Sequence, residues 1–105
     1  MSWKMVRDHT EAVAIRQGVS GRWRKCRTPI SSLTKKLFEE AGEYVENMDA
    51  AELYDLLDVL TALIPLADPD GKAAAEHDKK LLEMGGFSLL IEWSPVPASR
   101  KDLTS

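Results

Sequence analysis

The middle of the chain alternates apolar and polar residues with the period of an α-helix. Between residues 31 and 47, apolar side chains recur at spacings of four and three, which places them on one face of a helix. Ser31 or Ser32 is the expected N-cap of this helix. The positions on its apolar face are Leu33, Leu37, Ala41 and Tyr44.

A second helix is predicted over residues 50–64, after the short turn NMDA. Asp49 is suited to cap it, and Glu52 follows three residues later, as in a capping box. The short turn makes the two helices antiparallel neighbours. Pro65 and the run DPDG are expected to end the second helix. Its apolar arc is wide enough to favour packing on two sides, as in a bundle or a dimer core. The arc consists of Leu53, Leu56, Leu57, Val59, Leu60, Leu63 and Ile64.

Outside this hairpin the pattern is less regular. A short helix is predicted within residues 5–17, ending at Gly18. An Ala-rich helix is predicted over residues 72–84, followed by a Gly-Gly stop. The apolar segment FSLLIEW (residues 87–93) is predicted to be extended, as a short strand or a packed arm.

The expected fold is all-α: an antiparallel helical hairpin plus a third helix. We place one domain at residues 1–93 and a disordered tail at residues 94–105, which contain prolines and small polar residues. A chain of 105 residues buries a thin core, so pairing of chains into a four-helix-type bundle is a natural supplement.

Composition narrows the classes of partner and location. The net charge of −3 gives no long-range attraction for nucleic acid or membranes, and no apolar run approaches the ~20 residues that span a bilayer. The single cysteine, Cys26, excludes an intrachain disulfide framework and fits a reducing compartment. The first residues lack the apolar core of a signal peptide. We therefore expect a cytoplasmic protein in which Cys26 is a packed or surface thiol.

Acidic residues on the two middle helices are the most informative group. With Leu37 at zero on a helical wheel, Glu40 lies at about −60°, on the edge of the apolar face, and Glu43 at about −120°. Glu39 lies at about −160°, almost opposite that face. Glu40 and Glu43 thus follow one flank of the first helix, and Glu40 is expected to lie deepest.

On the second helix, with Leu56 at zero, Glu52 lies at about −40°, inside the apolar arc, and Asp55 at about −100°, at its border. Asp58 falls on the polar side and is expected to face solvent. A carboxylate within an apolar arc is costly unless it is paired. Four carboxylates at i, i+3 spacing on two facing helices would offer oxygen ligands to Mg²⁺ or Mn²⁺. The alternative is that these acids are merely solvated and that Glu52 serves as the capping-box acid.

These residues resemble a known motif pair. KLFEEAGEYVE followed by AELYDLLDVLTAL is similar to the Glu-Glu-x-x-Glu and Glu-x-x-Asp helices of the MazG-like and phosphoribosyl-ATP pyrophosphohydrolase superfamily. KMVRD near the start and KKLLEMGGFSLLIEW near the end are similar to the flanking segments of one small branch of that superfamily. The resemblance covers roughly residues 4–93. Residues 9–30 depart from the branch, which affects the substrate pocket rather than the ligand set.

The resemblance implies an all-α, Mg²⁺-dependent enzyme that hydrolyses a nucleoside triphosphate to a monophosphate and pyrophosphate, acting as a homodimer or homotetramer. Its usual role is the removal of noncanonical or surplus nucleotides. Glu40, Glu43, Glu52 and Asp55 are the expected metal ligands, and Glu39 would bind a second metal or act as the base through a water. Cations expected to hold the distal phosphates are Arg7, Lys36, Lys79 and Lys80.

Two other interpretations stay open. The basic stretch GRWRKCR, with Arg22, Arg24, Lys25 and Arg27 around Trp23, is typical of nucleic-acid contacts. It is short and lies in an acidic chain, so a phosphate-binding or surface loop is favoured. The second interpretation is a non-catalytic helical interaction module, including a member of the superfamily that has lost its activity.

Overall fold

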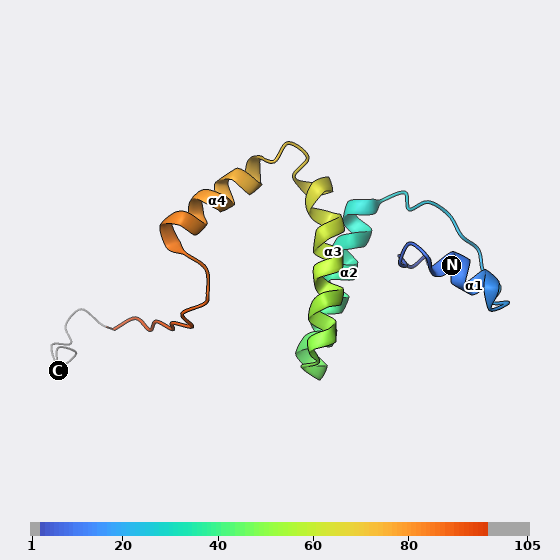
Figure 1. Cartoon of the computed structure of the whole chain (residues 1–105), viewed down its shortest axis with the longest axis horizontal. Coiled ribbons are helices and arrows are strands. Elements are labelled where there is room, and N and C mark those ends of the chain that lie inside the picture. Colours follow the sequence, from blue (N-terminus) through green and yellow to red (C-terminus); the bar gives the residue numbers. More distant parts are fainter. Residues whose placement is uncertain (1–2, 97–105) are drawn as a thin grey trace. The chain divides into compact units, whose positions relative to one another are not determined.

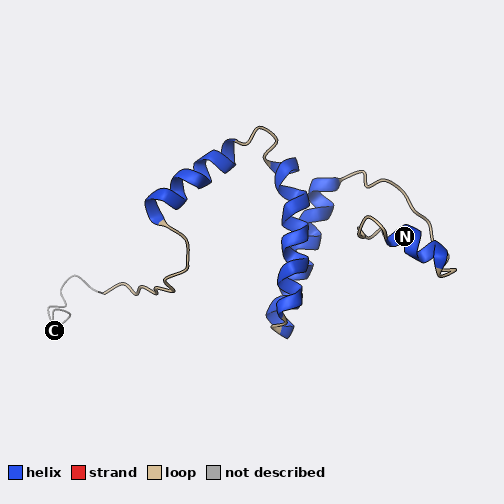
Figure 2. Ribbon diagram, viewed as in Figure 1, coloured by secondary structure: helices blue, strands red, loops and turns tan. Residues whose placement is uncertain are grey.

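A computed structural model describes residues 3–96 of the chain. These residues form helices and no strand, which confirms the all-α fold class (Figures 1 and 2). They fall into two compact units that divide between Lys72 and Ala73. The residues of the predicted tail beyond position 96 lie outside the described part. The helices are α1 (Thr10–Arg16), α2 (Pro29–Asn47), α3 (Ala50–Ala67) and α4 (Lys72–Met84).

Helix α2 begins two residues earlier than predicted. Its N-cap is Thr28 and Pro29 is its first residue, so the expectation of Ser31 or Ser32 as the cap is wrong. Proline suits this position because it lacks an N–H that would have no partner there and its φ is already helical. At the other end Met48 adopts a left-handed conformation (φ 54°) and donates its N–H to the carbonyl of Tyr44.

Helix α3 is capped as predicted, because the side chain of Asp49 accepts a hydrogen bond of 3.0 Å from the N–H of Ala51. The expected end at Pro65 is wrong, since the helix continues to Ala67 with the proline inside it. A proline in the last turn removes only one backbone hydrogen bond. The carbonyl of Ile64 still accepts from the N–H of Asp68 at 2.8 Å.

Helices α2 and α3 lie side by side and antiparallel, as predicted for the hairpin (Figure 1). The buried apolar residues between them are Leu33 on α2 and Val59 and Leu63 on α3. Leu37 and Met5 pack against this cluster and are partly buried. The core is thin, as expected from the chain length, and it fixes the two helix faces that also carry the acids.

The segment before α2 contains less helix than predicted. Helix α1 begins at Thr10 rather than near Met5, whose side chain instead packs on the hairpin core. The predicted end at Gly18 is confirmed, since this glycine has φ 70°. Its N–H bonds to the carbonyl of Ile15, and the next N–H bonds to that of Ala14, the paired hydrogen bonds of a Schellman motif.

The second unit consists of α4 and the segment that follows it. Helix α4 has the predicted bounds and ends at Gly85, with φ 75° and an N–H bonded to the carbonyl of Leu81. Residues 87–93 form a turn and irregular backbone, and their side chains are exposed, so the prediction of a strand is wrong. The apolar arm is not buried within its own unit. Among the described residues, no helix is long and apolar enough to cross a membrane.

Candidate metal centre

Three of the predicted ligands come together on the hairpin. Glu40 of α2 and Glu52 and Asp55 of α3 each offer a carboxylate oxygen, and these oxygens lie within 4.8 Å of one another. Glu52 and Asp55 share a flank of α3 because they are three residues apart. The antiparallel turn brings that flank opposite Glu40.

The cluster fits a hard divalent cation. All its donors are carboxylate oxygens, the ligand type of Mg²⁺ and Mn²⁺, and it contains no imidazole or thiolate that would favour zinc. Two oxygens on opposite sides of one Mg²⁺ are about 4 Å apart, given metal–oxygen distances of about 2.1 Å. The three oxygens all lie within 4.8 Å of one another, so they are close enough together to be candidates for binding one ion.

Glu40 is the deepest acid of its helix, as the helical wheel predicted, whereas Glu52, predicted to lie inside an apolar arc, is only partly buried. Only 9% of the surface of Glu40 is exposed, and no other acidic side chain among the described residues is buried. Its Oε1 lies 3.4 Å from the Nζ of Lys36, one helical turn earlier on α2. Lys36, one of the predicted phosphate-binding cations, is therefore at the cluster and acts as a counter-ion for its most buried carboxylate.

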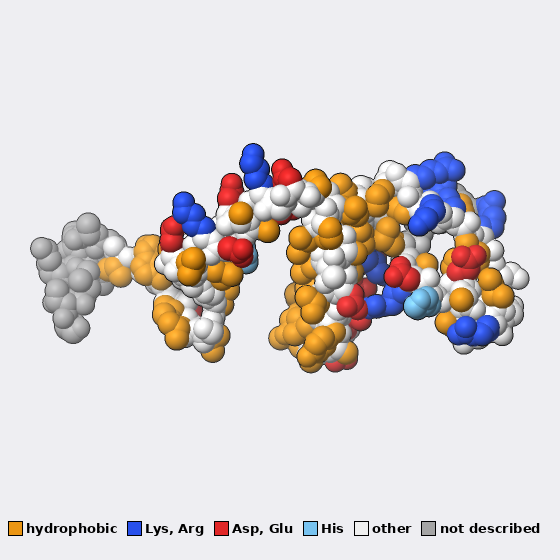
Figure 3. All heavy atoms as spheres, turned by 45° about the horizontal axis from the view of Figure 1, so that its top comes forward, with side chains coloured by type: hydrophobic (Ala, Val, Ile, Leu, Met, Phe, Trp, Pro, Cys, Tyr) orange, Lys and Arg blue, Asp and Glu red, His pale blue; other side chains and the backbone are white. Residues whose placement is uncertain are grey.

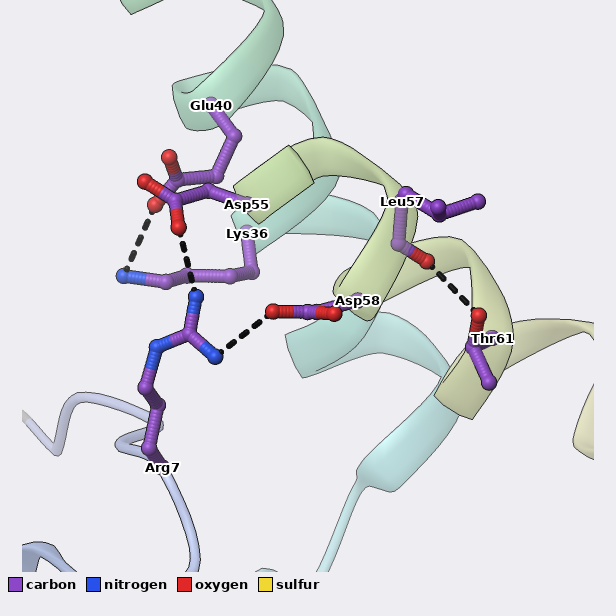
Figure 4. Close-up of polar contacts among 7 residues, drawn as sticks. All are labelled: Arg7, Lys36, Glu40, Asp55, Leu57, Asp58 and Thr61. Carbon is purple, nitrogen blue, oxygen red and sulfur yellow. Dashed lines mark hydrogen bonds and ion pairs between the residues drawn. The ribbon is translucent and has the colours of Figure 1, made fainter. Parts of the chain in front are cut away.

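Arg7 joins the cluster from the N-terminal segment. Its two terminal nitrogens bind different carboxylates of α3: Nη2 lies 2.7 Å from Oδ1 of Asp55, and Nη1 lies 2.8 Å from Oδ2 of Asp58 (Figure 4). These contacts raise the pKa of Arg7, chiefly through the hydrogen bond to Asp58, so it stays charged. Asp58 is exposed, as predicted, but it is paired rather than idle.

Glu43 lies beside the cluster rather than within it. It is exposed and does not belong to the group of three oxygens. The negative charge of Glu40 is the largest cause that raises the pKa of Glu43, followed by desolvation and the charge of Glu52. The pKa of Glu43 therefore responds to the charge of the neighbouring acids, and its role as a direct metal ligand stays a prediction.

Glu39 and Glu43 line an open hollow of about 520 Å³ on α2. Glu40 and Lys36 also contribute to it, and Lys4 reaches it from the N-terminal segment. Glu39 is partly exposed here, less so than a residue opposite the apolar face would be. Its role as a base or as a ligand of a second metal stays a prediction. Lys79 and Lys80 are exposed on α4 in the second unit, and their role at the site stays a prediction.

Sequence reasoning missed two contributors, Asp58 and Lys4. Asp58 lies three residues after Asp55, so its place beside that ligand could have been found from the spacing. The contact that gives it a role could not, because Arg7 is 51 residues away in sequence. Lys4 adjoins the hollow only because Met5 packs on the hairpin core.

Comparison of the chain with protein-family models, with curated protein sequences and with solved structures found no match.

Proposed function

We propose that this chain is a metal-dependent nucleoside triphosphate pyrophosphohydrolase. The observation that carries the proposal is the convergence of Glu40, Glu52 and Asp55. A buried carboxylate opposite two others is unfavourable without cations, and a Mg²⁺ ion would relieve their repulsion. The Glu-Glu-x-x-Glu and Glu-x-x-Asp spacing supplies the reaction class through the resemblance to the MazG-like superfamily.

In this proposal Glu40, Glu52 and Asp55 hold Mg²⁺ (or Mn²⁺), with Glu43 completing the set. The metal supplies charge neutralisation and polarisation of the phosphate group under attack. Glu39 accepts a proton from a water in the hollow. The water oxygen forms a bond to the α-phosphorus, the bond from that phosphorus to the bridging oxygen breaks, and pyrophosphate leaves with the bonding electron pair.

Arg7 and Lys36 neutralise the acids when no metal is bound. A metal ion would compete with Arg7 and Lys36 for the acids. The phosphate oxygens of a nucleotide would in turn attract the two cations. Arg7 is 64% exposed, and releasing its ion pairs costs little because solvent screens exposed ion pairs. Arg7 and Lys36 are the cations best placed to contact a bound triphosphate, and Lys79 and Lys80 are further candidates.

Assembly into a homodimer or homotetramer is part of the proposal. Apolar side chains on the outer faces of α2 and α3 are exposed, and Figure 3 shows hydrophobic atoms gathered over this hairpin. A second hairpin would cover them and form a four-helix bundle. The exposed residues include Phe38 and Val45 on α2 and Tyr54, Leu57 and Ile64 on α3. The role we propose is the removal of unwanted nucleotides in the cytoplasm.

The test is release of pyrophosphate from a panel of canonical and modified nucleoside triphosphates, with Mg²⁺, with Mn²⁺ and with EDTA. We expect metal-dependent release together with a monophosphate product. The matched pair of variants is Glu40→Gln at the cluster and Glu83→Gln on α4, an exposed acid of the other unit. Full activity of Glu40→Gln would contradict the assignment of the site.

A non-catalytic helical module is the second candidate, and one observation favours it. Arg7 and Lys36 already pair with two of the three acids, so the cluster is partly neutralised without any metal. This candidate predicts no rise in melting temperature on adding Mg²⁺, whereas a metal that binds only the folded chain must raise it. Absence of both this rise and turnover would favour the module.

A further inference from the structure

A second hollow lies in the N-terminal part of the first unit. It has a volume of about 1190 Å³ and is formed by segments on both sides of α1, up to the first turn of α2. Sites for small molecules in proteins typically measure about 300–1,000 Å³, so a nucleotide-sized ligand would fit. Half of the residues in the segment 9–30, which departs from the resembling branch, line this hollow.

The lining of this cavity is strongly basic although the chain is acidic. Asp8 and Glu11 are its only acidic lining residues, so the six cationic ones leave a surplus of four positive charges in a chain of net charge −3. Figure 3 shows Lys and Arg atoms gathered over this part of the first unit. The cationic lining residues are Lys4, Arg7, Arg22, Arg24, Lys25 and Arg27.

Two lining residues connect the cavity to the metal centre. Arg7 lines the cavity and at the same time binds Asp55, one of the three clustered acids. Lys4 lines both this cavity and the hollow that contains Glu39 and Glu40. Lys4 is therefore common to the two hollows, and Arg7 joins the basic hollow to one acid of the carboxylate cluster.

Indole rings form part of the wall and orient a guanidinium group. Trp3 and Trp23 both line the cavity, and the guanidinium carbon of Arg24 lies 4.0 Å from the ring centroid of Trp3. Stacking of this kind holds the planar fork of an arginine while leaving its N–H groups available at the edge. Such forks match the paired oxygens of a phosphate group.

We propose that this cavity binds the pyrophosphate end of the nucleotide, that is, the β- and γ-phosphates that leave together. The inference rests on the proposed function. If a metal ion held by Glu40, Glu52 and Asp55 were to bind the α-phosphate, Arg7 and Lys4 would be the nearby cations available to the distal phosphates. Pyrophosphate carries its charge on two adjacent phosphates, which suits several cations lining one hollow better than the single, spaced charges of a nucleic-acid backbone do.

The experiment measures binding of inorganic pyrophosphate to the full chain in EDTA by titration calorimetry, without turnover or metal. The Arg24→Ala/Arg27→Ala variant removes two lining cations. The matched control, Arg16→Ala/Lys35→Ala, removes two exposed cations of the same unit that line neither hollow. We expect the first variant, which removes two lining cations, to weaken binding about tenfold or more, which corresponds to about 1.4 kcal/mol or more. The control should stay within about twofold of the unchanged chain.

Three results would overturn the inference: no pyrophosphate binding to the unchanged chain, equal losses in both variants, or a single-stranded oligonucleotide that binds more tightly than pyrophosphate through Arg24 and Arg27. Circular dichroism checks that both variants keep their helices. The outcome is separable from that of the proposed function. If Arg24→Ala/Arg27→Ala leaves metal-dependent turnover unchanged, the proposed enzymatic function is supported and the proposed pyrophosphate site is not. If pyrophosphate binds but no nucleotide is turned over, the binding site is supported and the enzymatic function is not.

Discussion

The α2–α3 hairpin and the second unit both contain helices, but among the described residues of these two regions only the hairpin buries apolar side chains. In the hairpin, the apolar faces of two neighbouring helices meet and bury Leu33, Val59 and Leu63. In the second unit α4 has no buried residue, and Phe87 beyond it is 93% exposed. Helical periodicity is a local property of a sequence, whereas burial requires a second face at the right distance. The candidate metal centre lies in the region that has both.

The largest expected effect contrasts an acid of the hairpin with an acid of the second unit. Glu40→Gln should lower turnover by about 10²–10³-fold, because it removes a charged ligand from the cluster and leaves the metal poorly held. Glu83→Gln, on α4, should leave turnover within about twofold. Pyrophosphate release measures both variants, and circular dichroism checks that they remain folded. Equal losses in the two variants would remove the distinction between the regions.

The second contrast concerns stability. Leu63→Ala removes one of three residues of the hairpin core and should lower the free energy of unfolding by about 2–3 kcal/mol. Leu82→Ala acts on a side chain that is 89% exposed and should change it by less than about 0.5 kcal/mol. Urea denaturation followed by circular dichroism at 222 nm compares them. If Leu82→Ala lowers the free energy of unfolding as much as Leu63→Ala does, α4 is packed in solution.

Replacing two glycines by alanine should change the stability of the chain in opposite directions. Gly42 lies inside α2, and a Cβ placed there would meet nothing within 4 Å, so Gly42→Ala should stabilise the chain by about 0.5–1 kcal/mol. Gly85 ends α4 with φ 75°, where Gly85→Ala should destabilise the end of that helix by about 1 kcal/mol. Melting temperatures of the two variants measure the effect. A stabilising Gly85→Ala would show that α4 does not end at this glycine.

The sequence predicted those features that depend on residues close together in the chain. The face shared by Leu33 and Leu37, the cap at Asp49, the bounds of α4 and the depth of Glu40 all follow from spacings of three or four residues. The bond from Arg7 to Asp58 spans 51 positions, and no local pattern indicates it. The prediction of a strand over residues 87–93 was wrong for a related reason. A short apolar run fits a strand, a turn or an arm equally well until the surface that it packs against is known.

The smallest expected effect tests whether Glu43 senses the cluster. The charge of Glu40 raises the pKa of Glu43, so the folded chain holds a proton there more tightly than the unfolded chain does. Its ionised form therefore opposes folding. This penalty is absent below the pKa of the unfolded chain and develops as the pH rises through the raised pKa of the folded chain. Glu43→Gln should stabilise the metal-free chain slightly near neutral pH, and the gain should shrink as the pH falls toward about 4.5.

Glu76→Gln, an exposed acid of α4, is the matched control and should show no such pH-dependent gain. Thermal melts of both variants and the unchanged chain from acid to neutral pH, in EDTA, make the measurement. Saturating Mg²⁺ should reverse the order, because the metal offsets the repulsion and Glu43→Gln then lacks a charge that favours the ion. If Glu43→Gln stabilises the chain by the same amount in Mg²⁺ as in EDTA, Glu43 does not interact with the metal.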